Sequence, residues 1–198
     1  MTAQYTGSAF GTIPTRPEDI TPLALGARVP NIFLPNEDGK TVNVNATLRE
    51  KPAVLIIYRG GWCPYCNMQM SSLRLVEDEF YKLGFNMFGI SPDKPSKLAE
   101  SRGKHNFKYQ LLSDSKMTVA KAFGLAYKLD DDTVKMMKEK FNTDIEGDSG
   151  ETHHLLPVPA VYLVDSSGVF GFNYVNPDFT VRMDSNELLR IAQKKYAR

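Results

Sequence analysis

The sequence is poor in cysteine, histidine and net charge, and each shortage argues against a class of protein. Two cysteines in 198 residues cannot build the disulfide framework of a small secreted domain. Only three histidines are present, none at partner spacing to the cysteines, which argues against a structural zinc site with its four ligands. The 24 basic and 23 acidic side chains are dispersed and give a net charge of +1, so we expect neither nucleic acid nor a membrane surface as a partner.

Long apolar runs are also lacking. No stretch approaches the roughly 20 residues that span a bilayer, and residues 1–21 lack a basic start followed by an apolar segment. We therefore expect a soluble, cytoplasmic protein. With 42% hydrophobic residues the chain can bury a sizeable core, most simply in one domain over residues 23–198 after an irregular N-terminal extension over residues 1–22.

Both cysteines lie in one short motif, Gly-Gly-Trp-Cys-Pro-Tyr-Cys at residues 60–66, directly after the apolar run 53–58. That run is rich in β-branched residues and too short for a helix, as in a buried parallel strand. Helical spacing of the later apolar residues predicts a helix that starts with Pro64 and has Cys63 at its cap. Free backbone N–H groups and the helix dipole then favour a Cys63 thiolate. We interpret Cys63 as the nucleophile and Cys66 as the resolving thiol.

Other roles for the cysteines are less favoured. A structural disulfide across so short a loop removes little entropy from the unfolded chain. A shared metal site would need two copies of the chain to approach symmetrically, and inert packing is the remaining alternative. We therefore favour redox chemistry and expect no bound metal.

The rest of the chain alternates between predicted strands and helices. We expect a β-hairpin, a strand that completes a parallel crossover after the motif helix, a second hairpin and a closing helix; these lie at residues 29–44, 85–90, 160–174 and 185–196. Residues 127–150 differ in composition and predict a helical insertion. Its apolar face is either core packing or part of a lid beside the site.

This order of elements resembles the thioredoxin fold, an α/β fold with a central mixed β-sheet flanked by helices, here with an N-terminal β-hairpin extension and the helical insertion. The resemblance narrows to peroxiredoxin-like proteins of the alkyl hydroperoxide reductase and thiol-specific antioxidant (AhpC/TSA) family. The resemblance rests on short segments that match the family pattern, at residues 26–34, 38–40, 89–93, 112–114, 123–125 and 163–168.

The resemblance implies a function and a partner. It places Cys63 at the position of the peroxide-attacking cysteine, and Pro159 at the position of the cis-proline that faces the cysteines in thioredoxin-like proteins, so we expect a cis Val158-Pro159 bond. It implies antioxidant activity with no bound cofactor. The expected partners are a hydroperoxide or disulfide substrate, an external thiol reductant of the thioredoxin or glutathione system, and a second copy of the chain in a homodimer.

The sequence also departs from the family pattern. Typical members carry proline seven residues and threonine or serine three residues before the attacking cysteine, where this chain has Ile56 and Gly60. The hydroxyl that activates the peroxide is therefore missing. Arg59 is the nearest substitute and Arg182 a less favoured one. For Arg59, we favour a solvated or carboxylate-paired side chain over this role.

The Cys-Pro-Tyr-Cys sequence itself resembles the glutaredoxin motif. Trp62, Pro64 and Tyr65 would then offer a surface to a peptide or to glutathione, together with Val158 and Pro159, although plain packing of Trp62 and Tyr65 is an equal alternative.

Three functions follow from these observations. We predict a thiol peroxidase that uses Cys63 and Cys66. The first alternative is a thioredoxin-like or glutaredoxin-like thiol–disulfide oxidoreductase, favoured by the spacing of the cysteines and the missing hydroxyl. The second is a non-enzymatic binding module that is controlled by the redox state of the cysteines.

Overall fold

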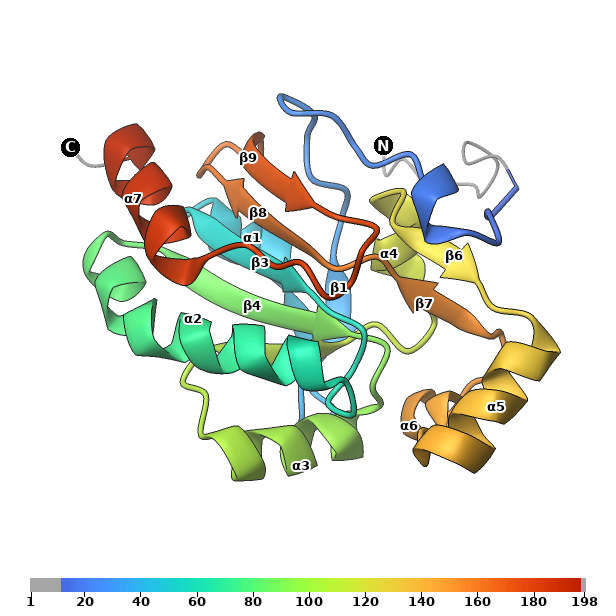
Figure 1. Cartoon of the computed structure of the whole chain (residues 1–198). Coiled ribbons are helices and arrows are strands. Elements are labelled where there is room, and N and C mark those ends of the chain that lie inside the picture. Colours follow the sequence, from blue (N-terminus) through green and yellow to red (C-terminus); the bar gives the residue numbers. More distant parts are fainter. Residues whose placement is uncertain (1–11, 197–198) are drawn as a thin grey trace.

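A five-stranded sheet forms the centre of the computed structural model, which describes residues 12–196 (Figure 1). Its strands are β3 (Ala53–Ile57), β4 (Asn86–Ser91), β5 (Gln110–Ser113), β8 (Ala160–Val164) and β9 (Phe170–Val175). The order across the sheet is β5-β4-β3-β8-β9. Strands β3, β4 and β5 are parallel, whereas β8 pairs antiparallel with both β3 and β9. The predicted mixed sheet is therefore confirmed, and β9 runs in the same direction as β3.

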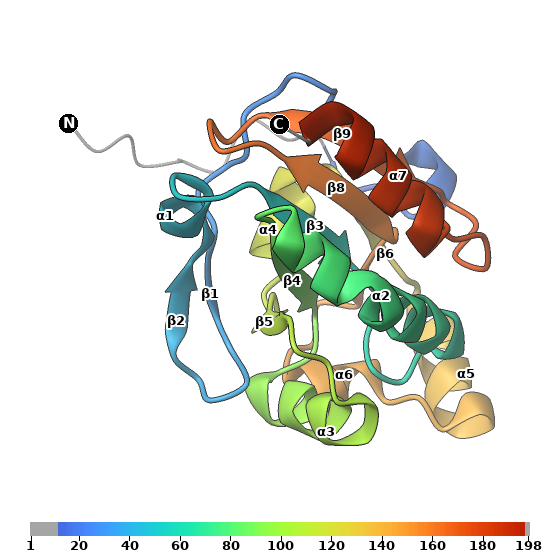
Figure 2. The ribbon, with the colours of Figure 1, turned by 90° about the vertical axis from the view of Figure 1, so that its left-hand side faces the viewer.

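Helices cover both faces of the sheet. They are α1 (Val44–Leu48), α2 (Pro64–Lys82), α3 (Pro95–His105), α4 (Thr118–Ala122), α5 (Asp131–Phe141), α6 (Ile145–Ser149) and α7 (Ser185–Tyr196). Helices α2 and α7 lie side by side on one face, with α3 beyond α2 (Figures 1 and 2). The opposite face is covered by α1 and α4.

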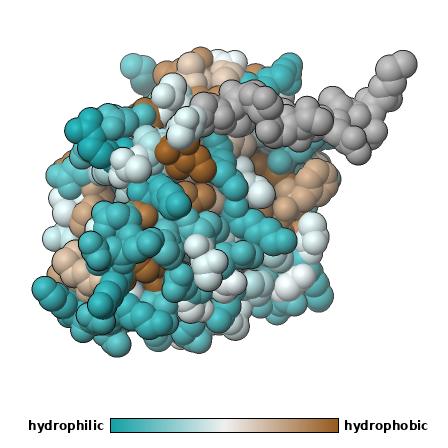
Figure 3. Space-filling view, turned by 90° about the vertical axis from the view of Figure 1, so that its right-hand side faces the viewer, coloured by the Kyte–Doolittle hydropathy of each residue, from teal (hydrophilic) through white to brown (hydrophobic). Residues whose placement is uncertain are grey.

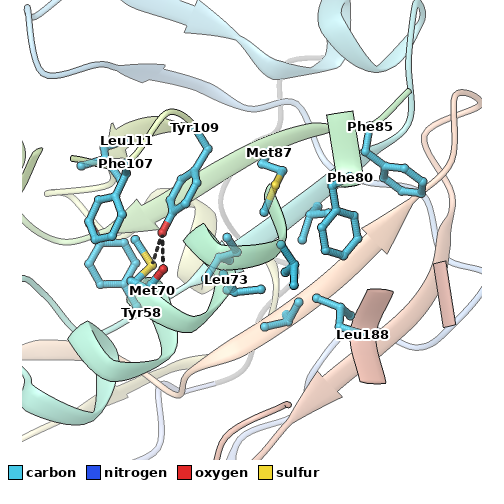
Figure 4. Packing of buried hydrophobic residues seen from close by; sticks show 14 of the residues in the cluster. Tyr58, Met70, Leu73, Phe80, Phe85, Met87, Phe107, Tyr109, Leu111 and Leu188 are labelled. Atoms are coloured by element: carbon cyan, nitrogen blue, oxygen red, sulfur yellow. Dashed lines mark hydrogen bonds between the residues drawn. The ribbon is translucent and has the colours of Figure 1, made fainter. Parts of the chain in front are cut away.

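Side chains of the central strand β3 alternate between two cores. Val54 and Ile56 pack toward α2 and α7, whereas Leu55 and Ile57 pack toward α1 and α4. Every residue of β3 is buried, and full burial of such a side chain contributes about 1.5–3 kcal/mol. Figure 4 shows the α2 side of the core, where the Tyr109 hydroxyl donates to the Met70 carbonyl at 3.1 Å. The strand that leads to the cysteines is therefore firmly held.

The predicted first hairpin is present as β1 (Phe33–Pro35) and β2 (Thr41–Asn43), which pair antiparallel. Its turn is closed by the Asn36 side chain, which accepts hydrogen bonds from the N–H groups of Asp38 and Lys40. The second hairpin and the closing helix are confirmed by β8, β9 and α7.

The part of the N-terminal extension that is described lies against the body of the protein. Residues 12–22 include the short 3-10 helix η1 (Pro17–Asp19), and the Pro14 carbonyl accepts a hydrogen bond from the Lys128 N–H at 2.8 Å. The remainder of the predicted extension, residues 1–11, lies outside the described residues. The domain boundary at residue 23 stays a prediction.

The predicted insertion, residues 127–150, is helical in α5 and α6, whereas its first residues are extended. It begins with β6 (Ala126–Lys128), which pairs antiparallel with β7 (Leu155–Pro157). The strand forms because β7 offers its backbone groups as partners, a long-range contact that three residues of sequence do not reveal. Helices α5 and α6 follow, and Val134 and Met137 of α5 pack into a buried cluster. These two residues of the apolar face are therefore core packing, whereas the third, Phe141, is 66% exposed.

The side of the molecule that carries α5 and β6 presents a mainly hydrophilic surface with separate hydrophobic spots (Figure 3). Within residues 12–196, no helix combines the length and apolar character needed to cross a bilayer.

The expected cis bond between Val158 and Pro159 is absent, because no peptide bond in the described part of the chain is cis. The Val158 N–H donates to the Leu125 carbonyl at 2.9 Å, next to the pairing of β6 with β7. The chain passes from there directly into β8, so the geometry is met by a trans bond, which X–Pro sequences favour by about 0.5–1 kcal/mol.

Candidate active site

Cys63 sits where β3 delivers the chain to the start of α2. It is the N-terminal cap of α2, and its Sγ accepts a hydrogen bond from the Cys66 N–H at 3.4 Å. Pro64 occupies the first turn, where a missing N–H costs nothing. The predicted capping position of Cys63 is therefore confirmed, and an amide donor of the first helical turn points at its sulfur.

The backbone before Cys63 depends on glycine. Gly60 has a φ of 146°, and a side chain there would collide with Trp62. The Cys63 N–H donates to the Gly60 carbonyl at 3.1 Å, which closes the turn.

Cys66 lies one helical turn after Cys63 and faces the core. Neither cysteine is in a disulfide in this structure, and they are only 1% (Cys63) and 0% (Cys66) exposed. The hydrogen bond with the Cys66 side chain, the Cys66 N–H and the charges of Arg59 and Arg182 lower the pKa of Cys63 to about 6, although burial opposes them. Burial raises the pKa of the Cys66 thiol, and its hydrogen bond with Cys63 raises it further. Cys63 is thus suited to attack as a thiolate while Cys66 keeps its proton.

Arg182, the less favoured candidate, is the arginine that contacts the sulfurs. Its Nη2 lies 3.3 Å from the Cys66 Sγ and 4.0 Å from the Cys63 Sγ. Two acceptors fix the guanidinium: the Gln69 Oε1 at 3.1 Å from Nη1, and the Phe179 carbonyl at 2.7 Å from Nε. A positive charge with directed N–H donors therefore lies beside both thiols.

The sheet topology explains how Arg182 reaches the site. It belongs to the segment between β9 and α7, and β9 runs parallel to β3. The two strands therefore end at the same edge of the sheet, so the segment after β9 lies beside the cysteines. In the sequence, only the predicted hairpin at residues 160–174 indicated that the segment after it would return to the edge of the sheet that carries the cysteines.

Arg59 is neither solvated nor paired with a carboxylate, so our favoured interpretation of it was wrong. It is 8% exposed, and among the described residues it forms no salt bridge and its Nε has no hydrogen-bond partner. The centre of its guanidinium lies 5.0 Å from the Trp62 ring and 4.1 Å from the Phe179 ring. Stacking on the two aromatic rings, favourable by about 0.5–2 kcal/mol per contact, keeps the cation in place without a carboxylate.

The other predicted binding residues fall into two groups. Pro64 and Tyr65 are exposed at the start of α2, and the Tyr65 ring meets the Phe179 ring edge-on at 5.8 Å. Val158 and Pro159 are buried, and Val158 packs in the cluster that also contacts Trp62. The first group offers an accessible surface next to Cys63, whereas the second lies beneath it.

The sequence analysis assigned no role at the site to one buried carboxylate. Asp93, just after β4, accepts a hydrogen bond from the Gly61 N–H at 2.7 Å through Oδ2. Its signals in the sequence were its place directly after a predicted strand and its inclusion in residues 89–93, one of the segments that carry the family resemblance. Within residues 12–196, no group of three or more histidine, cysteine or acidic side chains is arranged to hold a metal ion.

Comparison with known proteins places these features in a family. A sequence model of the AhpC/TSA family matches residues 25–171. The peroxiredoxin Bcp of Escherichia coli (strain K12) is 34% identical over 106 residues, which cover 54% of this chain and 67% of that protein. The putative chloroplastic peroxiredoxin Q of Oryza sativa subsp. indica is 27% identical over 168 residues, covering 85% of this chain and 66% of that protein.

Solved structures share the fold. The peroxidoxin BcpB of Mycobacterium tuberculosis aligns with a TM-score of 0.68 at 21% identity, covering 86% of this chain and 97% of that chain. Peroxiredoxin Q of Xanthomonas campestris aligns with a TM-score of 0.66 at 16% identity, covering 88% of this chain and 97% of that chain. At these identities the likeness establishes the thioredoxin-like architecture alone.

Proposed function

Because the chain belongs to the AhpC/TSA family, we propose that it is a thiol peroxidase in which Cys63 attacks the hydroperoxide and Cys66 resolves the oxidised sulfur. The relatives support the thiol-based peroxidase chemistry. The single observation that supports the assignment of roles is the position of Cys63 at the N-terminal cap of α2, where its Sγ accepts the Cys66 N–H; the lowered pKa of Cys63 and the raised pKa of Cys66 agree with it.

In the first step, the Cys63 thiolate attacks one oxygen of the hydroperoxide and the O–O bond breaks. Cys63 becomes a sulfenic acid, and the departing oxygen leaves as an alcohol, or as water from hydrogen peroxide, after taking a proton. Negative charge develops on that departing oxygen. Arg182 stabilises it with a directed guanidinium, in place of the hydroxyl that is absent at Gly60.

In the second step, the Cys66 thiol attacks the sulfenic sulfur of Cys63. A disulfide forms, and the hydroxyl leaves as water with the proton of Cys66. The short contact between the Cys66 N–H and the Cys63 Sγ shows that both residues share one helical turn. Two thiol groups of an external reductant of the thioredoxin or glutathione system then restore the dithiol.

Access requires movement, because Cys63 is only 1% exposed. Arg182 contacts both sulfurs from the segment between β9 and α7, Phe179 of the same segment lies over Arg59, and this segment has no regular structure. We propose that it shifts to admit substrate along the exposed surface of Pro64 and Tyr65, and that Trp62 and Arg59 also contact the substrate.

The cellular compartment, the domain boundary and the oligomeric state are also proposals. We propose that the protein works in the cytoplasm, where thiol reductants keep the two cysteines reduced. We propose one thioredoxin-like domain from residue 23 onward, which works as a monomer or as a homodimer.

Stopped-flow mixing of the reduced protein with hydrogen peroxide and with an organic hydroperoxide tests the function. Trp62 is the only tryptophan and stacks on Arg59 beside Cys63, so its fluorescence reports the site. We expect thiol loss far faster than that of a free cysteine, and none in Cys63→Ser. Loss at the rate of a free thiol of equal pKa, together with rapid exchange with glutathione disulfide, would identify a disulfide oxidoreductase instead.

A further inference from the structure

The loop after β4 carries a buried carboxylate that touches the turn before Cys63 and has no part in the proposed reaction. Asp93 is 2% exposed. Its Oδ2 accepts hydrogen bonds from the Gly61 N–H at 2.7 Å and from the Ser91 hydroxyl at 3.1 Å. On the other side of the same residue, the Gly61 carbonyl accepts from the Asn67 side-chain amide at 2.8 Å. Gly61 is therefore fixed at both of its backbone groups, close before Cys63.

The turn has little freedom to find other partners. A side chain at Gly61 would collide with the Ser101 hydroxyl, which shows how closely the neighbouring α3 approaches. Asp93, Arg59 and Trp62 line a cavity of about 10 Å³, about the room of one water molecule. A water molecule in this cavity would give the Asp93 carboxyl a partner for proton exchange.

Charged and titratable groups surround Asp93 on several elements. Those that face it, or line the same cavity, are Tyr58, Arg59, Lys97, Asp148, Glu151, His153 and His154. Burial raises the pKa of Asp93 to about 7, with a smaller contribution from Asp148; the hydrogen bonds from Gly61 and Ser91 and the charge of Lys97 oppose it. The carboxyl therefore changes charge close to neutral pH.

We propose that Asp93 is a positioning residue whose ionisation tightens the turn at Gly61 and thereby makes the reactivity of Cys63 depend on a second proton. A carboxylate accepts stronger hydrogen bonds than a neutral carboxylic acid does. The ionised form therefore fixes the Gly61 N–H, and with it the cap of α2, more firmly. The proposal rests on the proposed role of Cys63 as the attacking thiol.

The test compares Asp93→Asn with its parent in a Cys66→Ser background, so that Cys63 is the only thiol. Asparagine keeps the shape and one acceptor oxygen but cannot ionise. Rates of alkylation by iodoacetamide and of oxidation by hydrogen peroxide are measured between about pH 5 and about pH 9, a range that contains the ionisations of both groups. Ultraviolet absorbance of the thiolate in the same samples corrects each rate for the ionisation of Cys63 itself.

The corrected rate of the parent divided by that of Asp93→Asn then gives the effect of the Asp93 charge on the reactivity of Cys63. We expect this ratio to lie within about twofold of unity at the acidic end and to rise to about three- to tenfold at the alkaline end, because a charge-assisted hydrogen bond is roughly twice as strong as a neutral one. The midpoint should fall at about 7, the pKa of Asp93. A ratio that does not change with pH would overturn the proposal.

Two further variants test whether the pH dependence is specific to Asp93. Asp114→Asn is the matched control, since Asp114 is also 2% exposed and follows the neighbouring strand β5, but binds the start of α4. The ratio of corrected rates, parent over Asp114→Asn, should not change with pH. A change as large as that for Asp93→Asn would contradict the proposed role of Asp93. Ser91→Ala removes a hydrogen-bond donor to Asp93 and should therefore raise the pKa of Asp93. The midpoint that Asp93 gives to the corrected-rate profile of the Cys66→Ser protein should then move to higher pH.

The Ser91→Ala shift keeps the proposal testable if Asp93→Asn does not fold, and an unmoved midpoint would then overturn it. Alkylation needs no peroxidase activity, so the two proposals can fail separately. A step in alkylation with no peroxide reduction in the wild type refutes the function but not the role of Asp93.

Discussion

The cysteine turn (residues 60–66) and the arginine loop (residues 176–182) meet at one site but are held in different ways. The cysteine turn follows a strand whose residues are all buried, and Asp93 and Asn67 fix its backbone. The arginine loop has no regular structure, and its Phe179 and Val181 are 37% and 46% exposed. The proposed attacking sulfur is thus held by regular structure and backbone hydrogen bonds, whereas the proposed assisting charge is held by side-chain contacts of an irregular, partly exposed loop.

The largest effect should come from the cysteine turn. Cys63→Ser removes the attacking thiolate, so we expect the rate of peroxide reduction to fall by more than about 10³-fold, as is usual when a nucleophile is lost. Stopped-flow kinetics with hydrogen peroxide measure it. Cys66→Ser is the control, because it should still consume one equivalent of peroxide and stop at the sulfenic acid, which mass spectrometry detects. Full turnover in Cys63→Ser would refute the assignment.

Arg182→Met should have the second largest effect. It keeps most of the packing but removes the guanidinium beside both sulfurs, and loss of one donor to a developing oxyanion costs about 10²–10³-fold in rate. Arg182→Lys should recover part of the loss. The matched control is Arg190→Met on α7, a side chain that is 73% exposed. If Arg182→Met retains the wild-type rate constant, the arginine loop has no catalytic part.

The reaction should weaken in acid. The pKa of Cys63 is lowered to about 6, so the thiolate predominates above that pH and is lost as the pH falls through it. One unit below the pKa, about a tenth of the thiolate is left, and the rate of the first step should fall about tenfold. The pH dependence of the rate in single-turnover mixing measures this. A midpoint near that of a free cysteine, about 8.5, would contradict the lowered pKa.

Phe179→Ala should loosen the arginine loop with a smaller effect. Phe179 lies over Arg59, and loss of a cation–π contact of about 0.5–1 kcal/mol should make opening about two- to fivefold easier. A bulky aromatic disulfide reagent should therefore react faster with Cys63. Phe141→Ala on α5 removes a ring that is 66% exposed and should change nothing. Unchanged reactivity in Phe179→Ala would show that opening does not depend on this contact.

The smallest effect should follow Arg59→Lys. The charge that lowers the pKa of Cys63 is kept, but the flat stacking between Trp62 and Phe179 is lost. We expect less than about a fivefold fall in rate and a loss of about 1 kcal/mol in the free energy of unfolding. Stopped-flow kinetics and urea denaturation measure the two. A fall in rate as large as in Arg182→Met would mean that the two arginines contribute equally to catalysis.

The cysteine turn could be predicted from the sequence because all of its determinants are contiguous. The apolar strand, Pro64 at the first helical position and the spacing of Cys63 and Cys66 are visible within about fifteen residues, as local helix-start signals usually are. The sheet and both hairpins followed from similar local signals. The start of the insertion did not, since a strand as short as β6 shows no period-two pattern and depends on its pairing with β7.

The contacts across the sheet edge could not be predicted. Arg182 is 119 residues from Cys63 and reaches it only because β9 runs parallel to β3. Arg59 is adjacent to the motif, yet its burial depends on Phe179 from the same distant segment. Asp93 meets Gly61 because β4 is the neighbour of β3. In each case the chemistry of the residue was visible, but its partner was set by strand order.

The distance along the chain between the two parts of the site also has a consequence during synthesis. Arg182 follows Cys66 by 116 residues, so ribosomes that add about 5–20 residues per second need roughly 6–23 s to supply it. For most of that interval the growing chain contains both cysteines without the strand β9, and for all of it without the cation of Arg182, which follows β9. If Arg182 assists the thiols as proposed, their full reactivity is acquired late, after the last strand of the sheet and the segment that follows it have been made.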